Sequence, residues 1–170
     1  VCLMAAGQSA IAALADDAPL PAPARAVWDL EKAHRQATPT RETICINGLW
    51  QWQPAGQADS PPAGGWGYFK VPGCWPGITD YMQHDCQTVF AHPSWKNLNL
   101  GTVAAAWYQR EISVPSDWAG RRVVLCLEYL NSSADVFLDG KKCGEARFPS
   151  GQIDLAPVCR PGGKHLLTLR

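Results

Sequence analysis

The chain has 170 residues, and its 15 basic and 15 acidic side chains give a formal net charge of zero at pH 7. A balanced charge leaves no electrostatic footprint for nucleic acid or for an anionic membrane surface. The hydrophobic content of 46% is typical of a globular protein that buries an apolar core. Composition therefore argues against those two partners, and the function has to be read from motifs.

The first fifteen residues form an apolar run that ends in Ala13-Leu14-Ala15, followed by two aspartates. An apolar stretch that closes on a small-x-small pattern is typical of the later part of a secretory signal peptide, here without its basic beginning. A buried or disordered N-terminal helix is the alternative. The first interpretation predicts a partial signal peptide over residues 1–15, processing before Asp16, and a secreted or periplasmic protein.

Two segments lack a sustained apolar period. Residues 16–40 are rich in Ala and Pro and have apolar spacing only between Val27 and Leu30, so we expect a linker with one helical turn. Residues 75–104 form the longest irregular stretch of the chain. Loops of that length in compact domains are usually functional or lie at an interface.

The second half of the chain shows the two-residue period of half-buried strands. One face of the first expected strand carries Tyr108, Ile112 and Val114, and the other face carries polar residues. The same period returns at Val123, Leu125, Leu127 and Tyr129. The pair Asp139-Gly140 lies between two further apolar runs. Both residues tolerate positive φ, so the sequence predicts a type I′ turn and a tight hairpin there.

Tryptophan and cysteine are both frequent, with eight and seven residues. We expect the rings that fall in or beside strands to be core residues, namely Trp50, Trp52, Trp107 and Trp118. Cys143 and Cys159 are expected to be small buried hydrophobes. Cys74 and Cys86 flank the long loop and could form a disulfide, although a sandwich core of this size does not require one.

Five motifs follow one another in a recognisable order. They are Ile46-Asn-Gly-Leu-Trp-Gln-Trp52, Val71-Pro-Gly-Cys-Trp-Pro76, Trp107-Tyr-Gln-Arg110 in a strand that ends in Val114-Pro115, Val136-Phe-Leu-Asp-Gly-Lys-Lys-Cys-Gly144, and Ile153-Asp-Leu155 with Arg160-Pro-Gly-Gly-Lys-His-Leu-Leu-Thr-Leu169. Together they resemble the N-terminal sugar-binding domain of glycoside hydrolase family 2, the group of β-galactosidases, β-glucuronidases and β-mannosidases. The resemblance implies an all-β fold over residues 41–170, an antiparallel β-sandwich of the galactose-binding-like jelly-roll type, truncated at the C-terminus.

The same resemblance implies a function. The parent protein would be a retaining exo-β-glycosidase acting on a β-linked carbohydrate, in which an immunoglobulin-like domain and an (α/β)-barrel follow this domain and the barrel supplies both catalytic glutamates. No catalytic residue, metal or cofactor is then expected in this chain. Two other classes remain open, a non-catalytic carbohydrate-binding module and a structural interaction domain of another secreted protein.

Substrate contacts are expected from the long loop. An aromatic face packs against the C–H groups of a pyranose while a carboxylate or an amide binds its hydroxyls, so the candidates are Asp80, Trp95 and Asn97. A metal site built from His84, Asp85, Cys86 and His92 is the competing interpretation. Adjacent residues of one loop rarely converge on an ion, and paired ligand spacing is missing from this stretch.

Three charged residues of the expected strands are further candidates for functional groups. Glu111 and Glu128 could lie on neighbouring strands, but each is expected on a solvated face or in a salt bridge. Arg110 shares parity with Tyr108 and Ile112, which directs it toward an apolar layer. A buried guanidinium requires a carboxylate or carbonyl partner, so we expect Arg110 to be structural.

Overall fold

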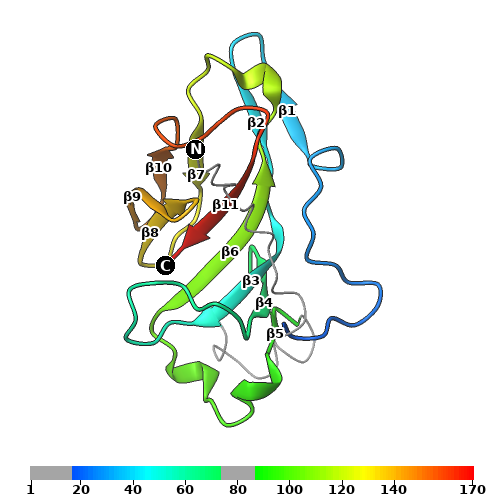
Figure 1. Ribbon diagram of the computed structural model, residues 1–170, viewed down its shortest axis with the longest axis vertical. Helices are drawn as coiled ribbons and strands as arrows, with labels where there is room; N and C mark the ends of the chain where they lie inside the picture. Colours follow the sequence, from blue (N-terminus) through cyan, green and yellow to red (C-terminus); the bar gives the residue numbers. More distant parts are fainter. Residues whose placement is uncertain (1–16, 74–86) are drawn as a thin grey trace, which may run out of the picture.

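The computed structural model describes residues 17–73 and 87–170, and this part of the chain is built almost wholly from strands (Figure 1). The strands are β1 (Arg35–Ala37), β2 (Glu42–Ile44), β3 (Gly48–Pro54), β4 (Gly67–Val71), β5 (Val89–Phe90), β6 (Ala106–Ser113), β7 (Val124–Leu127), β8 (Ser133–Leu138), β9 (Lys141–Arg147), β10 (Gly151–Asp154) and β11 (Lys164–Leu169). Three short 3-10 turns join them, η1 (Pro93–Trp95), η2 (Leu100–Thr102) and η3 (Ser116–Trp118).

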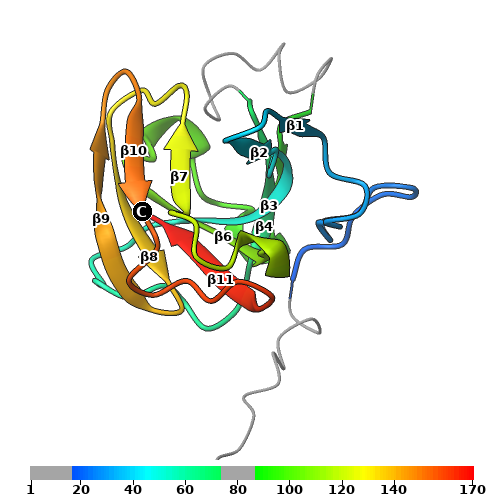
Figure 2. The ribbon, with the colours of Figure 1, turned by 90° about the horizontal axis from the view of Figure 1, so that it is seen from above.

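The strands form one large sheet and two small ones. The large sheet has seven strands in the order β5-β4-β3-β6-β11-β8-β9, and the small sheets are β10-β7 and β1-β2. Every pairing is antiparallel. Figure 2 shows β7 and β10 standing opposite the β8–β9 side of the large sheet. The expected all-β antiparallel sandwich is confirmed, with two layers of unequal size.

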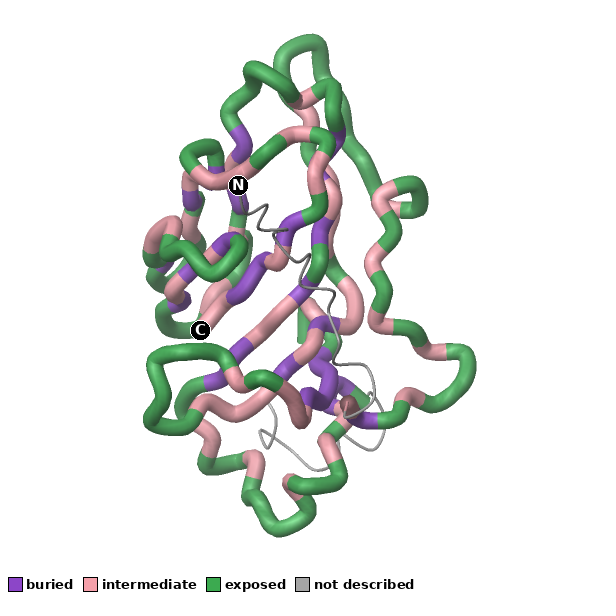
Figure 3. The backbone as a smooth tube through the Cα atoms, viewed as in Figure 1, coloured by how far each residue is buried: buried purple, intermediate pink, exposed green. Residues whose placement is uncertain are grey.

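The layers are joined by a buried apolar cluster. It brings Leu125 from β7 and Ile153 from β10 against Ile112, Val136 and Leu167 of the large sheet. A second cluster lies further along the large sheet, around Trp52, Phe69, Val89 and Ala106. Figure 3 shows the buried positions concentrated along the strands, with exposed residues in the connections.

The tryptophans that the sequence assigned to the core are placed there. Trp50, Trp52 and Trp107 expose 3%, 0% and 2% of their surface. Trp118 is half-buried against the first cluster, and its indole N–H donates to the carboxylate of Glu42 at 2.6 Å. Cys143 and Cys159 are free thiols that pack against the same cluster as apolar residues would, but they are half-buried and not fully buried as expected.

The turn predicted between β8 and β9 is confirmed. Asp139 has φ of 50° and Gly140 has φ of 76°, and Leu138 pairs with Lys141 on either side of them. Positive φ at both central positions matches the twist of an antiparallel hairpin. The register shifts by one residue between Val136 and Phe137, which the apolar pattern did not reveal.

Three details of the strand assignment were wrong. Tyr129 is 83% exposed, because β7 ends at Leu127 and the chain then turns so that the N–H of Leu130 donates to the carbonyl of Pro149 at 2.8 Å. A strand, β5, lies within the stretch expected to be irregular and pairs with β4. Strand β1 lies within the expected linker and pairs with β2.

Residues 17–34, which we call the N-terminal strap, are attached to the large sheet at one end and to the β2–β3 connection at the other. The carboxylate of Asp17 accepts from the side chain of Gln51 at 2.8 Å, and the N–H of Ala18 donates to the carbonyl of Trp66 at 2.7 Å. The indole N–H of Trp28 donates to the carbonyl of Cys45 at 3.1 Å. The strap therefore follows the sandwich and is held to it at both ends (Figure 1).

Several sequence-based expectations concern residues outside the described ranges. They are the signal peptide at residues 1–15, the pairing of Cys74 with Cys86, and the site residue Asp80. Within the described ranges, no helix is long and apolar enough to cross a membrane.

Candidate functional site

Within the stretch 75–104 expected to contact substrate, the part that connects β5 to β6 takes its local structure from two capping side chains. The imidazole of His92 accepts the N–H of Ser94 at 3.2 Å and starts η1. The side chain of Asn99 accepts the N–H of Gly101 at 2.9 Å and starts η2. Polar side chains that cap exposed turns in this way fix the backbone of a loop.

Trp95 is directed into the protein. Its ring packs edge-on against Trp52, with 5.5 Å between the ring centroids, and joins the second apolar cluster. The ring also lies over Gly67, where a Cβ atom would come within 2.7 Å of the indole and 2.5 Å of the carbonyl of Phe90. Only glycine permits this approach, so Trp95 anchors the loop to the sheet.

Asn97 lies on the outside of the same turn. It is exposed, and the turn is closed by the N–H of Leu98, which donates to the carbonyl of Trp95 at 2.8 Å. The loop therefore pairs a half-buried aromatic anchor with an exposed amide two residues later. Asp80, the third residue expected in the site, belongs to the part of the chain that is not described.

The carboxylates weighed as catalytic candidates are separated by the fold. Glu111 in β6 forms an exposed ion pair with Lys164 of β11 at 2.8 Å, as expected for a solvated residue. Glu128 is exposed and follows β7, which belongs to the small sheet. The two residues therefore do not lie on neighbouring strands, because β6 pairs with β3 and β11. Among residues 17–73 and 87–170, no group of three His, Cys, Asp or Glu side chains is placed to hold a metal ion.

Arg110 is buried and bound by backbone carbonyls, as its parity predicted. Its guanidinium donates to the carbonyls of Ile46 at 2.6 Å and Asn47 at 2.8 Å and also to that of Leu49. It lies 5.0 Å from the centre of the Trp50 ring. Burial lowers the pKa of Arg110 to about 10. One side chain of β6 thus organises the loop that leads into β3.

Sequence reasoning missed the role of His165. This histidine is 4% exposed, and its Nδ1 lies 2.7 Å from the carboxylate of Asp139 while its Nε2 accepts the N–H of Arg160 at 3.0 Å. Both ring nitrogens are therefore engaged, which makes His165 a structural residue. No spacing in the sequence relates positions 139 and 165, since a long-range strand pairing brings them together.

The sequence itself matches no protein-family model and no curated protein. The fold, however, is similar to part of several solved β-glucuronidases. For the β-D-glucuronidase of Dictyoglomus thermophilum, the TM-score is 0.57 at 14% identity, over 80% of this chain and 20% of that chain. For the β-glucuronidase of Bifidobacterium dentium, solved with coumarin-3-O-glucuronide, the TM-score is 0.57 at 25% identity, over 80% of this chain and 21% of that chain.

A third likeness is to the β-glucuronidase of Faecalibacterium prausnitzii, with a TM-score of 0.51 at 20% identity over 73% of this chain. The chain therefore has the all-β sandwich fold found in a portion of these enzymes. It spans about a fifth of their length. This fold is therefore one that several glycosidases contain as part of a longer chain.

Proposed function

We propose that this chain is the N-terminal sugar-binding and support domain of a glycoside hydrolase of family 2, a retaining exo-β-glycosidase. The observation that carries the proposal is the shared fold with β-glucuronidases, which extends over 80% of this chain but only 20–21% of two of those enzymes. The order of the five sequence motifs supports the same family. The partners are then an immunoglobulin-like domain and a barrel of the same protein.

The chemistry of retaining hydrolysis supports different roles for this domain and for the barrel. Retaining hydrolysis requires two carboxyl groups about 5–5.5 Å apart, one as nucleophile and one as acid and then base. Glu111 is engaged with Lys164 on a solvated face, and Glu128 follows a strand of the other sheet. The catalytic pair therefore belongs, in this proposal, to the barrel, and this domain holds the barrel in place.

The β5–β6 loop is proposed to contribute to substrate binding. Trp95 fixes the loop through Trp52 and Gly67, and the exposed amide of Asn97 is free to bind a sugar hydroxyl. Asp80, which precedes β5 in the sequence, is proposed as the third contact. The role proposed for Trp95 is mainly to position the loop, since its ring is used in packing.

Export is part of the proposal. The Ala13-Leu14-Ala15 pattern supports a signal peptide and hence a secreted or periplasmic enzyme. N-terminal sequencing of the exported protein tests this point. Asp16 is the expected first residue, and retention of residues 1–15 would contradict it.

The coding sequence that adjoins residue 170 tests the family assignment. We expect it to encode an immunoglobulin-like segment and then a barrel with two glutamates at the ends of its strands. A stop codon or an unrelated module at that point would overturn the assignment and favour a carbohydrate-binding module or a structural domain instead.

A further inference from the structure

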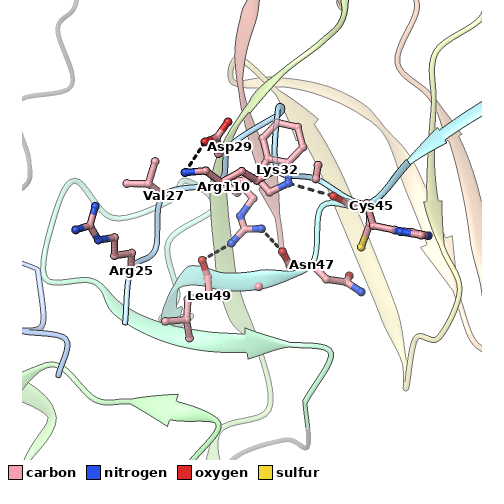
Figure 4. A pocket seen from close by; sticks show the side chains of 12 residues that line it. Arg25, Val27, Asp29, Lys32, Cys45, Asn47, Leu49 and Arg110 are labelled. Carbon is pink, nitrogen blue, oxygen red and sulfur yellow. Dashed lines mark hydrogen bonds and ion pairs between the residues drawn. The ribbon is translucent and has the colours of Figure 1, made fainter. Parts of the chain in front are cut away.

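A hollow of about 400 Å³ lies between the N-terminal strap and the loop that surrounds Arg110. Figure 4 shows the strap residues Arg25, Asp29 and Lys32 on one side and Asn47, Leu49 and Arg110 on the other. Ligand sites in proteins commonly measure about 300–1,000 Å³, so the hollow is large enough for a sugar residue. It is separate from the β5–β6 loop, which contributes no residue to it.

The charges that line the hollow do not cancel. Arg25, Lys32 and Arg110 are cationic, and Asp29 is the one acidic residue in the lining, paired with Lys32 at 3.2 Å. The formal balance is three positive charges against one negative charge, an excess of two with His34 neutral. An anion that enters the hollow is therefore attracted to it.

The positive charge of Arg110 is poorly compensated within the protein. Its described partners are carbonyls, which satisfy hydrogen bonds but carry no full negative charge. Its Nε is buried and has no hydrogen-bond partner among the described residues. Burial also lowers its pKa, because the charged form is poorly solvated there. A nearby carboxylate would compensate this charge.

The uncharged lining suits a sugar ring. Trp28 lines the hollow and is fixed by its hydrogen bond to the carbonyl of Cys45. Asn47 is exposed at the opposite side, with its amide available to solvent. An aromatic surface, an amide and cations are the groups that recognise, respectively, the C–H face, the hydroxyls and the carboxylate of an acidic sugar.

We infer that this hollow binds a carboxylated sugar residue of the hexuronate type, at a site apart from any catalytic centre. Arg25 and Lys32 bind the carboxylate, and Trp28 and Asn47 contact the ring. The inference rests on the proposed function in one respect, namely that the ligand is a carbohydrate. It adds a second, non-catalytic point at which an acidic saccharide is held by this domain.

The experiment titrates the 170-residue chain with D-glucuronate, D-glucose and acetate, and follows binding by calorimetry and by the tryptophan indole signals in NMR spectra. We expect saturable binding of D-glucuronate and at least tenfold weaker binding of the other two, on the order of one lost charge-assisted contact. Arg25→Gln and Lys32→Gln should each weaken D-glucuronate binding about fivefold, the upper range for an exposed ion pair. Lys141→Gln, at an exposed lysine of β9 outside both the hollow and the β5–β6 loop, should leave binding unchanged.

Three results would overturn the inference. These are no saturable binding of D-glucuronate, equal binding of D-glucose or acetate, and binding that Arg25→Gln and Lys32→Gln leave intact. The variants concern exposed residues, and a circular dichroism spectrum shows whether each is folded. If the binding experiment fails but the adjoining coding sequence encodes a barrel, the family assignment still holds. If D-glucuronate binds but no barrel is encoded, this site is supported and the proposed enzyme function is wrong.

Discussion

The imidazole of His165 and the carboxylate of Asp139 meet across 2.7 Å, although 26 residues separate them in the chain. The second carboxylate oxygen of Asp139 accepts the N–H of Leu166 at 2.8 Å. Asp139 thus forms part of the β8–β9 turn and also ties that turn to β11. Asp139 therefore has two roles, since it adopts the positive φ of the turn and its carboxylate also binds β11.

This contact predicts a loss of stability in acid. Burial tends to raise the pKa of Asp139, but the hydrogen bonds from His165 and from the backbone of Leu166 outweigh it and hold the pKa below the ordinary value of 3.8. A lowered pKa in the folded state stabilises the protein above the unfolded value, and this contribution is lost as pH falls through the folded value. Stability should therefore decrease below about pH 4.

The variant Asp139→Asn isolates the charge, because asparagine also tolerates positive φ. Urea denaturation at pH 7 should show that Asp139→Asn unfolds more easily than the wild type. The gap between the two should narrow as pH falls below about 4, where the wild-type carboxylate becomes protonated. A gap that stays constant from pH 7 to pH 2 would refute this role of the carboxylate.

Replacing Arg110 should be among the most damaging single changes. Arg110→Met removes the donors of three carbonyls around Ile46, Asn47 and Leu49, and buried acceptors without partners are costly. We expect the free energy of unfolding to fall by about 3 kcal/mol. Arg122→Met is the matched control, since Arg122 pairs with Asp154 on an exposed surface and should change stability by less than about 1 kcal/mol. Similar losses of stability in Arg110→Met and Arg122→Met would disprove the stabilising role of the hydrogen bonds from Arg110 to the three carbonyls.

The hairpin turn predicts a specific cost for a side chain at position 140. Gly140 has φ of 76° and open space around it, so Gly140→Val introduces backbone strain without a clash. The expected cost is more than about 1 kcal/mol in urea denaturation. Gly56 provides the control, because a Cβ there also meets open space and no positive φ is involved. If Gly140→Val and Gly56→Val are equally stable, a side chain at position 140 causes no backbone strain in the turn.

The β5–β6 loop predicts a contrast between two neighbouring residues. Trp95→Ala removes the ring that packs on Trp52 and over Gly67, and it should lower the free energy of unfolding by about 2 kcal/mol. Asn97→Ala changes an exposed amide and should stay within about 0.5 kcal/mol of the wild type. Thermal denaturation of both variants decides the matter. An unchanged melting temperature for Trp95→Ala would show that the ring does not anchor the loop.

The sequence predicted those features that depend on local pattern. The Asp139-Gly140 turn follows from the conformational range of two residues, and the inward direction of Arg110 follows from the two-residue period of β6. The carbonyl partner of Arg110 followed from the cost of a buried charge. The Trp-rich core was also predictable, because these rings occupy strand positions.

Other features depend on contacts across the chain and could not be predicted. Tyr129 continues the period of β7 but is exposed, because the strand ends when the chain turns toward Pro149. Strand β1 exists only because β2 pairs with it, and β5 only because β4 does. The hollow beside Arg110 forms where the strap lies next to the residues that lead into β3. The sequence spacing of the lining residues does not indicate that they meet.

Hydrolysis of a panel of aryl β-glycosides by two purified proteins tests the central claim most directly. One protein is this chain alone, and the other is the product of the complete gene. We predict no turnover by the chain alone and clear turnover by the complete protein, because the two carboxyl groups of a retaining mechanism would lie in the barrel. Turnover by the chain alone that survives purification and is lost in Asp80→Asn or Asp85→Asn would contradict the account, as would a complete protein that cleaves none of the glycosides.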